Sequence, residues 1–96
     1  METFTSKIGT SRQIPASRVW IEGARLVRAG FIVTARYTLI EVDGMLALTL
    51  AETGARRVSG KGDKPIIDIT GDLIRRVFAG RETVTVDYTV GKIVIR

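Results

Sequence analysis

Residues 37–50 carry the sequence YTLIEVDGMLALTL, which decides the fold of the chain. Apolar and polar side chains alternate on either side of its centre, with Leu46, Leu48 and Leu50 as the clearest apolar set. Because side chains of a strand point alternately to opposite faces, this period of two predicts two strands that share one buried face. Asp43-Gly44, which separates the two runs, is typical of a tight β-hairpin turn.

The residues before this hairpin predict a strand and a short helix. Val19-Trp20-Ile21 is aromatic and β-branched, as strands are. The stretch 23–29 changes period, with Leu26 and Val27 on one side together with Phe31, which indicates a short helix that ends at Gly30. Residues 18–51 therefore predict a strand, a helical turn and a hairpin in that order.

The same order returns in residues 66–96. Ile66-Ile67-Asp68-Ile69 predicts a strand, and Thr70 is a candidate N-cap for a helix with Asp72 in its first turn. Alternating residues on either side of Val90-Gly91 then predict a second hairpin. The chain thus contains two strand–helix–hairpin units.

The two units superpose without a gap at an offset of 47 positions. The matched pairs include Leu26 with Leu73, Arg28 with Arg75, Phe31 with Phe78, Gly44 with Gly91, Leu46 with Ile93 and Leu48 with Ile95. An internal duplication explains this match, and a unit so short cannot bury its own apolar face. We therefore expect a mainly β protein with two short helices, in which the copies close into one pseudo-twofold β-barrel. The expected core comprises Ile21, Leu26, Phe31, Leu39, Leu48, Ile69, Leu73, Phe78, Val86 and Ile95.

The remaining segments predict connections rather than core. Residues 1–17 have Ile8 and Ile14 as their only aliphatic residues and predict a flexible tail. Residues 52–65 contain three glycines, a proline and more basic than acidic residues, which predicts a basic loop between the repeats. The expected organisation is a tail at 1–17 and a single domain at 18–96.

Composition limits the classes of function. The 96 residues include no cysteine and no histidine, which excludes disulfide scaffolds, Cys-rich zinc sites and the commonest general base. A formal net charge of +5 favours a polyanionic partner. No segment has the roughly 18 apolar residues of a membrane helix, and the first residues do not resemble a signal peptide, so we expect a cytoplasmic protein without membrane contact. Nothing in the sequence calls for a cofactor or a metal.

Two stretches carry a resemblance to known families. Residues 18–31, with Tyr37 and residues 44–48, resemble the SymE-like family of the AbrB/MazE swapped-hairpin superfamily. Residues 57–61 and 65–69 are similar to a module that precedes the catalytic domain in some phage cytosine DNA methyltransferases. The resemblance implies an AbrB-like fold that binds DNA through basic residues on its paired hairpins and nearby loops.

The candidate contacts to nucleic acid are basic residues of the helices, of the first strand and of the loop. They are Arg18, Arg25, Arg28, Arg56, Arg57, Lys61, Arg75 and Arg76. Lys and Arg bind nucleic acids by neutralising phosphates and releasing counterions. Arg28 and Arg75 are matched by the repeat, so a pseudo-twofold axis would present both to a symmetric partner. The loop is either a polyanion-contacting arm or a linker, and Trp20 is either a core or interface residue or a stacking platform for bases.

The favoured function is that of a small, non-enzymatic DNA- or RNA-binding protein of a toxin–antitoxin, regulatory or phage setting. The alternative is a phage-encoded protein-binding inhibitor or accessory module, similar to an anti-CRISPR, that acts on a host nucleic-acid enzyme. A third hypothesis is an RNA-cleaving toxin, for which the candidate carboxylates are Glu22, Asp68, Asp72 and Asp87. Strand edges left open by the hairpins favour a homodimer over a monomer.

Overall fold

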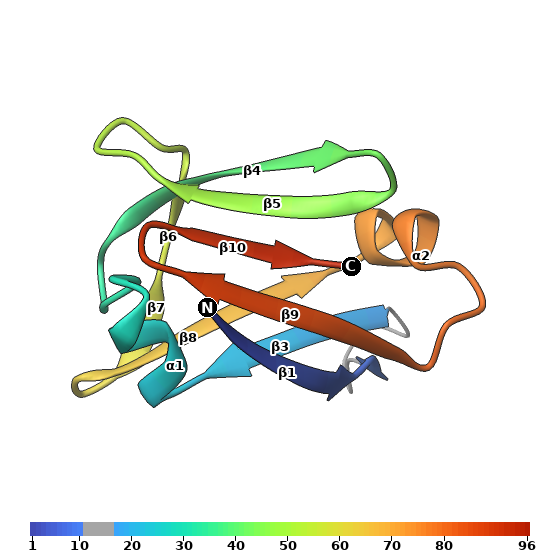
Figure 1. Ribbon diagram of the computed structural model, residues 1–96, viewed down its shortest axis with the longest axis horizontal. Helices are drawn as coiled ribbons and strands as arrows, with labels where there is room; N and C mark the ends of the chain where they lie inside the picture. Colours follow the sequence, from blue (N-terminus) through green and yellow to red (C-terminus); the bar gives the residue numbers. More distant parts are fainter. Residues whose placement is uncertain (11–16) are drawn as a thin grey trace.

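The computed structural model describes residues 1–10 and 17–96 as two β-sheets and two short helices (Figure 1). The strands are β1 Glu2–Lys7, β2 Gly9–Thr10, β3 Ser17–Glu22, β4 Arg36–Val42, β5 Met45–Leu50, β6 Arg56–Arg57, β7 Ser59–Lys61, β8 Lys64–Thr70, β9 Thr83–Thr89 and β10 Lys92–Ile95. The helices are α1 Ala24–Arg28 and α2 Asp72–Val77. The expectation of a mainly β chain with two short helices is confirmed.

The strands form two antiparallel sheets that pack face to face. One has six strands in the order β1-β9-β10-β5-β4-β6, and the other has four in the order β2-β3-β8-β7. In Figure 1 the six-stranded sheet lies across β3 and β8. The apolar residues of both inner faces interdigitate in one core, which includes Phe31, Leu46, Ile67 and Ile93.

Both predicted hairpins are present. β4 and β5 pair from Val42↔Met45 outward, and the turn residues Asp43 and Gly44 have φ of 51° and 75°. Positive φ at both central positions is the conformation that Asp-Gly favours in two-residue hairpin turns. β9 and β10 form the second hairpin, with Gly91 at its turn.

Each helix begins directly after a glycine. Gly23 and Gly71 occupy the N-cap positions with φ of 91° and 96°, a region open essentially to glycine alone. The prediction that Thr70 caps the second helix is wrong, because Thr70 is the last residue of β8 and no side chain caps α2. Among the described residues, no helix has the length and apolar character required to cross a membrane.

The core agrees with most of the predicted residues. Eight of the ten are buried, whereas Leu39 and Leu73 are only half-buried against the core. In α2 the fully buried side chain is Ile74, so the helix is rotated by one residue from the predicted orientation. Leu39 lies on β4 near the border of the six-stranded sheet, where fewer strands cover it.

The gapless offset of 47 positions is wrong for the strand and helix of the two units. The buried residues Val19 and Ile21 of β3 correspond in position to Ile67 and Ile69 of β8, 48 positions later. Since a slip of one residue reverses the face of every side chain in a strand, the offset of 47 would expose them. The helices keep the offset of 48, with Leu26 and Ile74 buried, so Arg28 corresponds to Arg76 rather than to Arg75.

Residues 2–7 are not a tail. β1 pairs with β9 over its whole length, from Glu2↔Tyr88 to Lys7↔Thr83, and forms one edge of the six-stranded sheet. Backbone hydrogen bonds to β9 hold these residues in a strand. Their sequence lacks the alternating aliphatic residues from which a strand could have been predicted. The predicted tail also covers residues 11–16, which lie outside the described residues.

The predicted loop contains two strands, and the sheets are open rather than closed into a barrel. β6 ends the six-stranded sheet and β7 ends the four-stranded sheet. Between them the buried Val58 is a corner at which the chain passes from one sheet to the other, and Ile8 is a similar corner between β1 and β2. The strand ladders are not continuous across these two corners, because β6 pairs only with β4 and β7 pairs only with β8.

Candidate nucleic-acid interface

Most basic side chains of the two helices and of β3 are neutralised by carboxylates. The described residues form the ion pairs Arg18–Asp68, Arg28–Glu2, Lys64–Glu22, Arg75–Asp72, Arg76–Glu41 and Arg96–Asp87. Four of the eight predicted contact residues, Arg18, Arg28, Arg75 and Arg76, are thus already bound to an anion. A phosphate would have to compete with these carboxylates.

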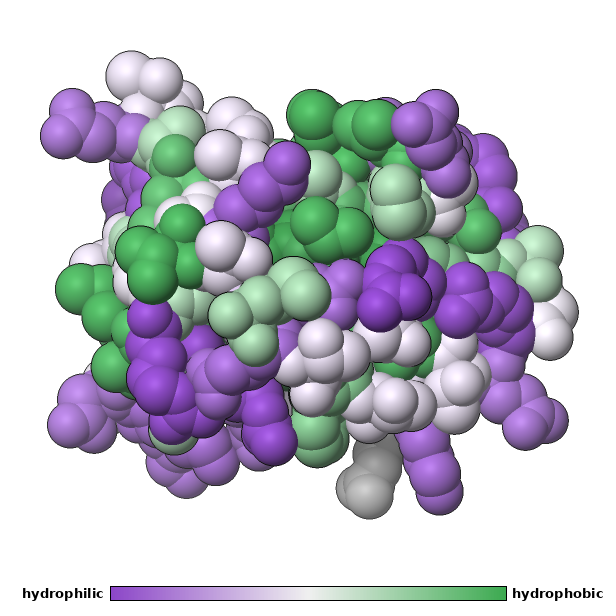
Figure 2. Space-filling view, viewed as in Figure 1, coloured by the Kyte–Doolittle hydropathy of each residue, from purple (hydrophilic) through white to green (hydrophobic). Residues whose placement is uncertain are grey.

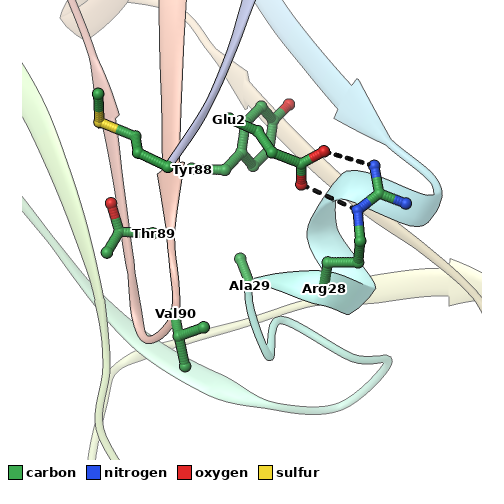
Figure 3. A pocket seen from close by; sticks show the side chains of 7 residues that line it. Glu2, Arg28, Ala29, Tyr88, Thr89 and Val90 are labelled. Atoms are coloured by element: carbon green, nitrogen blue, oxygen red, sulfur yellow. Dashed lines mark hydrogen bonds and ion pairs between the residues drawn. The ribbon is translucent and has the colours of Figure 1, made fainter.

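Arg28 lies in a hollow at the amino terminus of the chain (Figure 3). Its guanidinium donates two hydrogen bonds to the Glu2 carboxylate, at 2.9 and 2.7 Å. The cavity beside them has a volume of about 250 Å³ and is lined by Ala29, Tyr88 and Val90 among others. The hydrogen bonds from Arg28 lower the pKa of Glu2, which keeps this carboxylate ionised.

The other helix residues point to separate surfaces. The Arg25 guanidinium lies 4.2 Å from the ring centroid of Phe4. Arg75 pairs within its own helix with Asp72, whereas Arg76 reaches Glu41 of β4. Arg28 and Arg75, which were predicted to face one symmetric partner, therefore make different contacts. Arg28 and Arg76 are more alike, because each binds a carboxylate of a strand.

Trp20 is on the outer face of the four-stranded sheet and is 39% exposed. Its indole N–H donates to Glu22, and the Arg18 guanidinium lies 5.1 Å from its ring centroid while binding both oxygens of Asp68. Trp20 is thus not a core residue, because the neighbours Val19 and Ile21 point inward and the strand period places Trp20 outward. The alternation of residues 19–21 in the sequence could already have indicated that Trp20 points outward. Its role in an interface or as a stacking platform stays a prediction.

Arg36, Arg56, Arg57 and Lys61, which we call the basic edge, differ from the ion-paired arginines above. They line the side of the molecule along β4, β6 and β7, and no carboxylate of the described residues lies within ion-pair distance of them. Arg56, Arg57 and Lys61 were predicted from the sequence as one group, and the structure places them on one extended segment. Arg36, on the neighbouring strand β4, is the fourth member of the group.

Like charges face each other directly on the basic edge. Arg36 and Arg57 are partners in the β4–β6 ladder and therefore share one face of the sheet. Arg36 donates a hydrogen bond of 3.2 Å to the carbonyl oxygen of Gly54 and has no acidic partner among the described residues. Directly opposed like charges destabilise a strand pair, so an anion placed between these guanidinium groups would relieve a repulsion.

The remaining members extend the positive charge along the segment. Arg56 is the ladder partner of Tyr37; burial raises the pKa of this phenol, and the adjacent Arg56 guanidinium opposes the rise. Lys61 lies four residues beyond Arg57, at most about 13 Å along an extended chain. A backbone of successive phosphates is long enough to contact both ends.

Two glycines allow this segment to lie close to the rest of the molecule. A Cβ on Gly54 would be 2.5 Å from the carbonyl carbon and oxygen of Tyr37, and a Cβ on Gly60 would be 2.5 Å from the carbonyl oxygen of Lys64. Only residues without a side chain fit at these two points. The basic edge is therefore fixed to both sheets, and it is not a free linker.

The carboxylates considered for RNA cleavage are all engaged in ion pairs. Glu22 binds Lys64, Asp68 binds Arg18, Asp72 binds Arg75 and Asp87 binds Arg96. Among residues 1–10 and 17–96 no group of three or more acidic side chains is arranged to hold a metal ion. The geometry thus assigns these carboxylates to pairing with cations.

The ion pairs predict how stability depends on pH. Hydrogen bonds from Arg28, Trp20 and Arg96 lower the pKa values of Glu2, Glu22 and Asp87, respectively. A carboxylate whose pKa is lower in the folded than in the unfolded chain stabilises the fold above its unfolded pKa, near about 4, and this contribution is lost as pH falls further. We expect the urea midpoint to be nearly constant from pH 7 to 5 and lower at pH 3. A midpoint at pH 3 equal to that at pH 5 would contradict this, and Asp87→Asn should reduce the difference.

Comparison of the chain with protein-family models, with curated proteins and with solved structures gives no match. The site is therefore interpreted from its own geometry and charge.

Proposed function

We propose that the chain is a cytoplasmic, non-enzymatic nucleic-acid-binding protein of a regulatory, toxin–antitoxin or phage setting, and that the basic edge is its contact surface. The observation that carries the proposal is the concentration of Arg36, Arg56, Arg57 and Lys61 on one edge without a carboxylate partner among the described residues. Elsewhere in the fold, the exposed Arg28, Arg75 and Arg76 are ion-paired, whereas Arg81 contacts the Phe78 ring and the carbonyl oxygen of Arg96.

The chemistry of the basic edge suits a polyanion such as the phosphate backbone of a nucleic acid. Two guanidinium groups side by side offer the forked donors that bind phosphate oxygens in a bidentate manner. Each cation that contacts a phosphate releases condensed counterions, so binding energy accumulates along a line of cations without any sequence-specific contact. The proposal is therefore one of backbone binding, with DNA and RNA both as candidates.

The proposal includes a pseudo-twofold relation between residues 18–51 and 66–96, of the kind implied by the resemblance to the SymE-like and AbrB/MazE proteins. Strand pairing supports it. β3 pairs with β8 around Trp20↔Asp68, positions 48 apart, and β5 pairs with β10 around Ala47↔Val94, positions 47 apart. Equivalent strands that pair antiparallel at equivalent residues are what a twofold axis between two copies requires. The basic edge lies in the connection between the copies and is not duplicated.

The test is an anisotropy titration of labelled single-stranded DNA, single-stranded RNA and duplex DNA at about 50 and about 200 mM salt. For three phosphate contacts to duplex DNA, the association constant is expected to fall about 40-fold between the two concentrations. Absence of binding to every probe at about 50 mM salt would remove this function. The alternative, a protein-binding module that acts on a host nucleic-acid enzyme, would then be favoured.

A further inference from the structure

Trp20 is an exposed aromatic side chain that shares a sheet with part of the basic edge. Among the described residues, the exposed aromatic side chains are Phe4 and Trp20. Phe4 is on β1, at the opposite end of the six-stranded sheet from β6, and the Arg25 guanidinium lies over its ring. Trp20 is on β3, in the same sheet as β7, which carries Lys61. It is therefore the aromatic ring placed to act together with the basic edge.

Trp20 and Lys61 lie on the same face of the four-stranded sheet. In β8 the outward positions are Lys64, Ile66 and Asp68, because the residues between them are buried. Trp20 lies opposite Asp68, and Lys61 lies opposite Lys64. Residues directly opposite in a ladder share a face. Two strand spacings in one direction and four residues in the other separate Trp20 from Lys61, which is about 16 Å between their backbones.

The neighbours of Trp20 hold its ring in one orientation. The indole N–H donates to Glu22 at 2.9 Å, and Glu22 also binds Lys64 at 3.3 Å. The Arg18 guanidinium lies 5.1 Å from the ring centroid and is itself fixed by two hydrogen bonds of 3.0 Å to Asp68. A surface that is fixed before binding loses little conformational freedom when a ligand stacks on it.

Part of the ring is open to solvent in spite of these contacts. β2 pairs with Ser17 and Arg18 only, so among the described residues no strand is paired with β3 at Trp20 on the side away from β8. An exposed aromatic ring offers a flat surface on which every nucleobase can stack, because each base has a π-face.

The charges on this side of the molecule match the two parts of a nucleotide. The carboxylates of Glu22 and Asp68 lie beside Trp20, where they can also accept hydrogen bonds from the amino group of a base. Lys61 lies at the far end, where it can bind a phosphate. The turn residue Asp63 is near that end and forms no ion pair with Lys61.

We propose that Trp20 is a stacking platform for an unpaired base, and that single-stranded nucleic acid is the substrate class of the basic edge. The inference rests on the proposed function, because Lys61 and the adjoining arginines bind the phosphates of the same strand. At about 3.4 Å per stacked nucleotide, about five nucleotides span the distance from Trp20 to Lys61. In a duplex the base faces are stacked inside the helix, so Trp20 would meet only phosphates and base edges.

The test uses the fluorescence of Trp20, which is the only tryptophan of the chain. The full chain is titrated at about 50 mM salt with single-stranded DNA of about 12 thymidines, a length within the usual range of single-strand sites. We expect the DNA to quench the emission with the same midpoint as the anisotropy titration. A duplex of the same length and inorganic polyphosphate have no free base face, so they should bind the basic edge and leave the emission nearly unchanged.

Two variants of Trp20 separate the ring from its hydrogen bond. Trp20→Ala should weaken binding of the single strand at least about 5-fold and change duplex binding less than about 2-fold. Trp20→Phe keeps an aromatic ring but loses the N–H that donates to Glu22, and it should bind the single strand nearly as the wild type does. Circular dichroism and the urea midpoint check that both variants fold.

Ile40→Ala is the matched control. Ile40 is an exposed apolar residue of β4, and Figure 2 shows apolar side chains gathered over the β4–β5 hairpin. It belongs to the other sheet and its neighbours include no exposed aromatic ring. We expect this variant to bind single strands as the wild type does and to show the same quenching of Trp20.

The outcomes separate this inference from the function on which it rests. If single strands bind without quenching Trp20, or if folded Trp20→Ala binds them as the wild type does, the stacking platform is wrong and the proposed function stands. The same conclusion follows if the duplex or polyphosphate quenches as strongly, or if Trp20→Phe binds as weakly as Trp20→Ala. If no probe binds at about 50 mM salt, both fail. Quenching is measured on the wild type, so the test does not depend on the folding of a variant.

Discussion

Replacing Gly54 with alanine is expected to lower the free energy of unfolding by about 3 kcal/mol or more, at the upper end of overpacking effects. The new Cβ would lie 2.5 Å from the carbonyl carbon and oxygen of Tyr37 and 2.7 Å from its nitrogen. These atoms belong to a strand paired on both sides, with Leu50 and with Arg56, so they cannot move aside as a flexible side chain would. For a domain of this size, such a loss corresponds to a fall in Tm of roughly 12 °C or more.

Gly9→Ala is the control for this prediction. Its Cβ would be 3.9 Å from Cδ of Arg18, which is ordinary van der Waals contact, and its φ is outside the left-handed region. We expect a change of less than about 1 kcal/mol for this variant. Thermal and urea denaturation of both variants measure the difference. If Gly54→Ala unfolds at the same temperature as Gly9→Ala, the chain does not cross the strand as closely as described.

The two hairpins could be predicted from the sequence because their information is local. Alternation around Asp43-Gly44 fixes both the turn and the inner face, and the structure confirms this register. The strand and the helix of each unit were predicted correctly, but their alignment between the two units was wrong by one residue. A gapless match at 47 positions placed Leu26 on Leu73, whereas the burial of Ile74 and the N-cap glycines Gly23 and Gly71 show an offset of 48. The sequence contains identities at both offsets, so identity alone did not decide between them.

The first strand could not be predicted from its side chains. Glu2–Lys7 lacks an apolar period, and its stability comes from the ladder with β9 and from two arginines of α1. Arg25 covers Phe4, and Arg28 binds Glu2. These contacts pack the mostly polar first strand against α1. Such contacts join residues more than twenty positions apart, which a pattern over a local window cannot detect.

Only part of the candidate site could be predicted from the sequence, because the rest depends on contacts between residues far apart in the chain. The group of Arg56, Arg57 and Lys61 stands out in the sequence as a basic segment, and the structure keeps it together on one edge. Whether an arginine is free or paired depends on distant carboxylates, so the sequence did not separate these residues from Arg28 or Arg76. The sequence also gave no indication that Arg36 lies opposite Arg57.

The triple substitution Arg56→Ala, Arg57→Ala and Lys61→Ala is expected to weaken nucleic-acid binding at least about 30-fold at about 50 mM salt, and to reduce the salt slope by about 3. The physical reason is the loss of three cations that no carboxylate of the described residues neutralises. Removal of Arg57 also ends its repulsion with Arg36, so the variant should fold at least as stably at this pair as the wild type. Weakened binding therefore cannot be attributed to unfolding if the urea midpoint is unchanged.

The matched control removes three ion-paired arginines, with Arg28→Ala, Arg75→Ala and Arg76→Ala in one chain. Both triple variants lower the net charge of +5 by three, so the long-range attraction to a polyanion falls equally in each. A difference between them must then come from local contacts. We expect the control to change the salt slope by less than about 1, because each of its arginines already binds a carboxylate. If instead the control loses binding and the first variant keeps it, phosphates displace the carboxylates of Glu2, Asp72 and Glu41, and the contact surface lies on the helices.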